Sequence, residues 1–74
     1  MQTVPVHSTM IAEIGHDPYT NILEVRFHNG RIYHHFMVPR YEYEALMSAE
    51  SIGAYFNRVI RPHYRSTRID ESLV

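Results

Sequence analysis

The chain has 74 residues, a formal net charge of −1 and no cysteine, which excludes disulfides and cysteine-ligated zinc and leaves room for one small domain. A domain of this length buries only about 60% of the surface that its unfolded chain exposes, so its stability depends on good packing or on self-association. No apolar run approaches the ~18 residues of a membrane span, and the N-terminus lacks the features of a secretion signal. We therefore expect a cytoplasmic protein that does not associate with membranes, and Met1 indicates a free-standing chain.

Two extended segments are predicted in the first third of the chain. Residues 5–15 mix β-branched and polar residues, and the turn signature Asp17-Pro18 follows them. Residues 22–27 alternate between apolar and polar side chains, which is the pattern of a half-buried strand. These segments are interpreted as the first two strands of an antiparallel sheet.

A β-hairpin is predicted next, because Asn29-Gly30 is a strong turn signal, but its register is left open. A two-residue loop would pair Phe27 with Ile32 and turn Tyr33 and His35 away from the apolar face of the preceding strand. A three-residue loop with a glycine bulge would pair Phe27 with Arg31 and turn both side chains toward that face. A slip of one residue exchanges the faces of the whole returning strand, residues 31–38.

Two helices are predicted in the second half of the chain. Pro39 ends the returning strand and suits the first turn of a helix, and residues 40–49 are good helix formers. Ser48 or Ser51 can cap a second helix, which Pro62 ends. The apolar residues of this second helix fall on one face: Ile52, Phe56, Val59 and Ile60.

The order of these segments predicts an α+β fold, in which a three-stranded antiparallel meander is followed by two helices packed on one face (βββαα). A single domain is expected over residues 1–64. Residues 65–74 are polar and without periodicity, so they are expected to form a flexible C-terminal tail.

Neither a metal site nor a catalytic site is predicted, although the chain contains six histidines. The adjacent His34 and His35 would point to opposite faces of a strand, and no histidine pair has the i, i+4 spacing of a zinc helix. Asp17 beside His16 is interpreted as a turn carboxylate that accepts a hydrogen bond from its own backbone. A chain of this size rarely holds a pocket of several hundred Å3. We therefore expect a non-enzyme without metal or cofactor.

The arginines indicate a binding function. All basic residues are arginine, and residues 58–68 carry four of them without an acidic residue. Arginine suits phosphate and stacks on bases, and aromatic rings beside cations are typical of single-stranded RNA readers. Two surfaces are possible, one on the sheet if Tyr33 faces outward and one near the second helix. The candidate nucleic-acid-binding residues are Arg26, Tyr33, His35, Arg58, Arg61 and Arg65.

Other interpretations of these residues stay open. Tyr33 can be a core residue instead, arginines near a helix end complement the helix dipole, and a codon bias can favour arginine without any function. The first 57 residues hold three arginines against six acidic residues, which argues against strong non-specific binding. The alternative function is docking on a protein of the transcription or translation machinery, because arginines and exposed tyrosines are also hot-spot residues of protein interfaces. Homo-oligomerisation is left open.

Five blocks of residues 6–64 resemble, in order and spacing, the KTSC domain family. They are V-x-S-T-M-I (6–11), I-G-H-D (14–17), L-E-V-R-F (23–27), Y-x-H-x-x-V-P (33–39) and G-A-Y-F-N-R-V-I-R (53–61). That domain occurs at the C-terminus of some lysyl-tRNA synthetases and as small free-standing bacterial and phage proteins, and the attachment to a synthetase implies RNA binding. The family's central Y-x-Y reads Tyr33-His34-His35 here. If the last position is buried, its histidine requires a hydrogen-bond partner.

Overall fold

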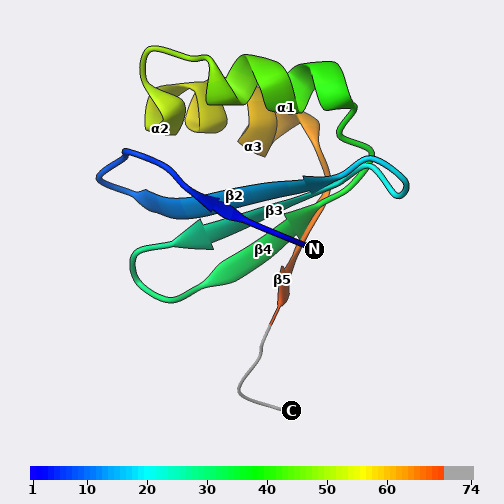
Figure 1. Cartoon of the computed structure of the whole chain (residues 1–74), viewed down its shortest axis with the longest axis horizontal. Coiled ribbons are helices and arrows are strands. Elements are labelled where there is room, and N and C mark those ends of the chain that lie inside the picture. Colours follow the sequence, from blue (N-terminus) through cyan, green and yellow to red (C-terminus); the bar gives the residue numbers. More distant parts are fainter. Residues whose placement is uncertain (70–74) are drawn as a thin grey trace.

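A five-stranded antiparallel sheet in the order β1-β2-β3-β4-β5 forms one layer, and helical segments cover one of its faces (Figure 1). The computed structural model describes residues 1–69. The strands are β1 (Val4–Pro5), β2 (Ile11–Asp17), β3 (Ile22–Phe27), β4 (Ile32–His35) and β5 (Ser66–Ile69). The helical segments are α1 (Arg40–Met47), α2 (Ile52–Tyr55), the π-helical η1 (Phe56–Ile60) and α3 (Arg61–His63). The α+β class and the meander followed by helices are confirmed, with two more strands than the three predicted.

The two additional strands lie at the edges of the sheet. The expected strand of residues 5–15 is divided, because the Ser8 hydroxyl accepts hydrogen bonds from the backbone N–H groups of Met10 and Ile11 and turns the chain between β1 and β2. At the other edge, residues that were expected in the flexible tail form β5 and pair with β4. Residues 70–74, the rest of that expected tail, lie outside the described residues.

The β3–β4 hairpin adopts the register of the three-residue loop. The Phe27 N–H donates to the Arg31 carbonyl over 2.9 Å, and Gly30 adopts a φ of 91°. The Asn29 side chain accepts a hydrogen bond from the Arg31 N–H, which helps to hold the bulge. Val25 therefore pairs with Tyr33. His35, two residues further along β4, points with Tyr33 toward the helical layer.

The second helix contains a widened turn that the sequence does not reveal. Ser51 caps it, since the Ala54 N–H donates to the Ser51 hydroxyl over 3.2 Å. The Arg61 N–H then bonds to the carbonyl of Phe56, five residues earlier. Pro62 has no N–H for the carbonyl four residues before it, and its ring crowds that carbonyl. The wide turn relieves this conflict, so the helix continues through Pro62 to His63 instead of ending at it.

The core lies between the sheet and the helices and is built from both. It consists of Ile11, Ile14, Leu23, Val25, Val38, Leu46, Phe56 and Ile60. The Glu42 carboxylate on α1 joins the helices, because it accepts hydrogen bonds from the hydroxyls of Tyr55 (2.5 Å) and Tyr64 (3.0 Å). Burial and this hydrogen bond raise the pKa of Tyr64 to about 12. Both tyrosines thus serve helix packing.

The N-terminal segment crosses β2 at Gly15, and this crossing can be tested. A Cβ at position 15 would lie 2.3 Å from the backbone oxygen of Gln2. We expect Gly15→Ala to displace the segment and to lower the free energy of unfolding by ~1–3 kcal/mol, measured by urea denaturation. The control is Gly53→Ala on α2, where the nearest atom is 3.6 Å away. The control is expected to be neutral or to stabilise by ~0.5–1 kcal/mol, and equal stability of the two variants would contradict the prediction.

Candidate functional site

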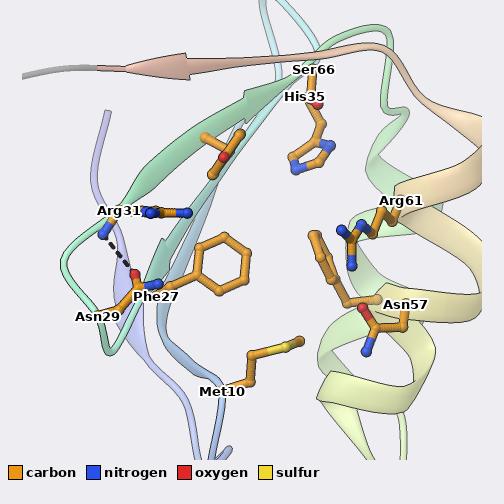
Figure 2. Close-up of a pocket in the computed structure, with 10 residues that line it drawn as sticks. Met10, Phe27, Asn29, Arg31, His35, Asn57, Arg61 and Ser66 are labelled. Atoms are coloured by element: carbon orange, nitrogen blue, oxygen red, sulfur yellow. Dashed lines mark hydrogen bonds between the residues drawn. The ribbon is translucent and has the colours of Figure 1, made fainter.

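A pocket of ≈ 410 Å3 lies between the β3–β4 hairpin and the helix that contains η1 (Figure 2). Its volume falls in the range of about 300–1,000 Å3 that is typical of small-molecule sites. The protein thus contains a pocket of a size that was expected to be rare in so short a chain. The lining residues are Met10, Phe27, Asn29, Arg31, Tyr33, His35, Phe56, Asn57, Arg61 and Ser66.

Aromatic rings from three elements form the walls of the pocket. Phe27 on β3 meets the rings of Tyr33 and Phe56 edge to face, with ring centroids 5.8 Å and 5.6 Å away. Phe56 also meets the ring of His35, at 5.3 Å and an interplanar angle of 86°. Such contacts are favourable and fix the ring orientations. The pocket therefore offers flat apolar surfaces of defined orientation to a ligand.

Arginines and amides form the polar part of the lining. Arg31 and Asn29 come from the hairpin, whereas Arg61 and Asn57 come from the helix (Figure 2). Within residues 1–69, neither the Arg31 nor the Arg61 guanidinium has an ion-pair partner. None of the described lining residues is acidic. The two positive charges are thus available to a negatively charged ligand.

The π turn sets the position of Arg61 relative to the walls. Its N–H bonds to the Phe56 carbonyl, so the two residues lie one wide turn apart and both line the pocket. Single π turns within α-helices occur frequently at functional sites. The distortion that Pro62 requires thus also shapes the pocket.

His35 is the unusual residue of the lining. It is only 3% exposed, and neither ring nitrogen has a hydrogen-bond partner among the described residues. Burial, with a smaller contribution from the neighbouring charge of His34, lowers the pKa of His35 to about 4. The ring is therefore neutral at pH 7, and no residue of 1–69 supplies the hydrogen-bond partner that a buried histidine requires.

The opposite face of the sheet carries a separate polar cluster. The Glu24 carboxylate, 7% exposed, accepts hydrogen bonds of 2.7 Å from both Arg26 and His34. Burial alone would raise the pKa of Glu24, but the bonds from His34 and Arg26 outweigh burial and hold the pKa below its ordinary value. Arg26 is thus on the face away from Tyr33, and the predicted sheet surface of Arg26, Tyr33 and His35 does not exist.

The structure brings together three of the six predicted site residues: Tyr33, His35 and Arg61 line the pocket. Arg58 on η1 and Arg65 before β5 are exposed and lie outside the lining. Arg65 instead contributes its backbone carbonyl, which accepts a 2.8 Å hydrogen bond from Phe36. Arg31 was not predicted as a site residue from the sequence. In the register of the three-residue loop, strand alternation places Arg31 on the same face as Tyr33 and His35. No sequence signal pointed to Asn29 as a lining residue.

Asp17 and its neighbour His16 have separate structural roles. Asp17 accepts a 2.9 Å hydrogen bond from the Tyr19 N–H, which confirms its role in the turn. His16 bonds to the Val38 carbonyl over 2.7 Å and stacks on Tyr43.

In the part of the chain that the structure describes, no three His, Asp or Glu side chains are grouped so that they could hold a metal ion. None of the helices in that part is long and apolar enough to cross a bilayer.

A family model and a solved structure indicate one family, and two further relatives are similar over nearly the whole chain. The family model of the KTSC domain matches residues 7–64. An uncharacterized protein of Stutzerimonas stutzeri strain A1501 is 42% identical over 71 residues, which cover 95% of this chain and 100% of that protein. A protein of Tsukamurella paurometabola is 35% identical over 65 residues, 88% of this chain and 97% of its own. The crystal structure of a KTSC domain protein from Yersinia pestis superimposes with a TM-score of 0.88 at 36% identity, covering 93% of this chain and 97% of that one.

Proposed function

The chain belongs to the KTSC domain family, and from the pocket that this member contains we propose that it is a small non-catalytic module that binds single-stranded RNA. The observation that carries the proposal is the composition of the pocket. Aromatic walls lie beside two arginines that have no ion-pair partner among residues 1–69, and the described lining has no acidic residue.

This composition matches the physical needs of a single-stranded nucleic acid. An unpaired base has a flat apolar face that stacks on aromatic side chains, and its phosphates pair with arginine. Arg68 adds a third cation, because it pairs with Tyr33 across β4 and β5 and so lies on the same face of the sheet. A base held against the Phe27 and Tyr33 walls would place its phosphates near Arg31, Arg61 and Arg68.

Removal of the pocket arginines tests this proposal. Three phosphate contacts predict that log Kd against log salt concentration has a slope of magnitude about 2, from ~0.7 per contact in a single strand. Arg31→Ala and Arg61→Ala are each expected to weaken binding and to reduce this slope by ~0.7. Fluorescence anisotropy with labelled mixed-sequence RNA between low and moderate salt gives both quantities.

The matched control is Arg40→Ala. Arg40 is exposed on α1, pairs with Glu44 over 3.4 Å and lies outside the pocket lining, so its loss makes the same change in net charge elsewhere. It is expected to leave affinity and slope close to those of the wild type. Absence of RNA binding at the lowest salt, or an equal loss in all three variants, would remove the proposal.

One observation favours a second candidate, docking on a protein of the transcription or translation machinery. Three large apolar side chains are exposed near one end of the sheet: Tyr19 (95%), Met37 (82%) and Tyr41 (73%). The loops that carry Tyr19 and Met37 are joined by a 2.8 Å hydrogen bond from Val38 N–H to the Asn21 carbonyl. A partner protein that survives nuclease treatment and is lost in Tyr19→Ser would favour this candidate over RNA.

A further inference from the structure

We infer that His35 is the residue by which the pocket distinguishes one nucleobase from another, through a hydrogen bond between its ring and the polar edge of an unpaired base. This inference rests on the proposed function and deepens it, because it names the part of the nucleotide that the pocket selects. The ligand class is an aromatic heterocycle that carries a phosphate, either as a free nucleotide or within RNA.

The first argument is the unmet hydrogen-bonding capacity of His35. A neutral imidazole offers one N–H donor and one nitrogen acceptor, and neither is used by any residue of 1–69. Buried polar groups are nearly always hydrogen-bonded, so an exception requires an explanation. An apolar residue would fill this site at lower cost to stability, whereas a polar ring is useful there if a ligand supplies the missing partner.

The second argument is the place and orientation of the ring. His35 lines the pocket (Figure 2), and its edge-to-face contact with Phe56 fixes its plane. Ser66 lies opposite it on β5, and Arg61 lines the same pocket from the helix. His34 extends from the other face of β4 toward Glu24. No described acidic side chain of the pocket competes for the His35 N–H.

The third argument concerns what kind of ligand fits all the lining groups together. The aromatic walls favour a flat ring, the arginines favour a phosphate, and His35 favours a ring that carries donors and acceptors at its edge. A nucleotide combines these features. Because the ring nitrogens of His35 are covered in the structure, the ligand must turn neighbouring side chains of the lining to reach them, and the His35 ring resonances should then shift on binding.

Base preference in wild type and in two variants tests the inference. The probes are RNA hexamers of A, C and U and an alternating G-U hexamer, together with the four free nucleoside monophosphates. We expect the wild type to prefer one hexamer by about tenfold, as one hydrogen bond allows. His35→Phe should lose this preference and keep the salt dependence, whereas His35→Gln should retain part of it. Amide spectra of both variants establish that they are folded.

The outcomes distinguish the inference about His35 from the proposed RNA binding on which it rests. Binding of all hexamers with equal affinity, or an unchanged preference in His35→Phe, overturns the role of His35 and leaves RNA binding intact. Absence of binding to every probe overturns both proposals. Binding of the free monophosphates with the same preference as the hexamers supports the inference and identifies a single nucleotide as sufficient.

Discussion

The free energy of unfolding is expected to fall by about 3 kcal/mol as the pH is lowered from 7 to below 4, because His35 must stay neutral in the folded protein. Its pKa is lowered from 6.5 to about 4. The unfolded chain therefore takes up a proton at this residue at a higher pH than the folded chain does. The stabilisation is fully present above pH 6.5 and is lost as the pH falls toward 4, at about 1.4 kcal/mol for each unit between the two pKa values.

The surroundings of His35 explain why its pKa is lowered. Burial is the largest cause of the lowered pKa, and the neighbouring charge of His34 adds to it. Arg31 and Arg61 line the same pocket, and no described lining residue is acidic, so no carboxylate favours the charged ring. Glu24 contributes in the same sense at lower pH, since its pKa is held below its ordinary value in the folded protein and its stabilisation is lost as the pH falls through that lowered pKa.

Urea denaturation of wild type and His35→Phe at several pH values between 7 and 4 measures the effect. Phenylalanine keeps an aromatic ring against Phe56 and removes the two ring nitrogens that have no partner among residues 1–69, so the variant should be at least as stable as the wild type at pH 7. It should also show a smaller loss below pH 6.5, leaving mainly the contribution of Glu24. Parallel stability curves for the two proteins would show that His35 is not the titrating group.

The sequence predicted the central strands and both helices because their signals are local. Alternation in residues 22–27, the turn at Asn29-Gly30 and the cap at Ser51 each act within a few residues, and each has its expected effect. The edge strand β5 was missed for a physical reason. It is held by backbone pairing with β4, and its mostly polar, exposed side chains show no buried face.

The site was harder to predict because it depends on one backbone choice. Each register turns one apolar side chain of β4 toward the helices. It is Ile32 in the register of the two-residue loop and Tyr33 in that of the three-residue loop. The positive φ of Gly30 and the hydrogen bond between Phe27 and Arg31 decide between them. The sequence left both registers open, and Ile32 is also buried, at 7% exposure. A histidine at position 35 argues against burial on average. The usual pattern of burial therefore conflicts with the structure at His35, a residue for which we propose a function, as is expected at functional sites.

Replacement of Phe56 by alanine is expected to lower the free energy of unfolding by ~3–5 kcal/mol. Phe56 is buried in the core, packs its ring against Phe27 and His35, and begins the π turn that carries Arg61. A chain of this length has a total stability of roughly 4–11 kcal/mol, so the variant should be close to unfolding at 25 °C. Urea or thermal denaturation followed by circular dichroism measures the loss.

Two further variants distinguish the structural role of Phe56 from its role as a pocket wall. Phe56→Leu conserves most of the volume and should cost less than about 1.5 kcal/mol, whereas Tyr19→Ala at a site that is 95% exposed should change stability by less than about 0.5 kcal/mol. If alanine and leucine at position 56 are equally stable, the ring is not a core residue. Phe56→Leu also keeps a folded domain in which the Phe27 wall has lost the ring that meets it edge to face and fixes its orientation. Its RNA affinity should therefore fall while its salt dependence, set by Arg31, Arg61 and Arg68, stays the same, because stacking and phosphate pairing are independent contributions of the same pocket.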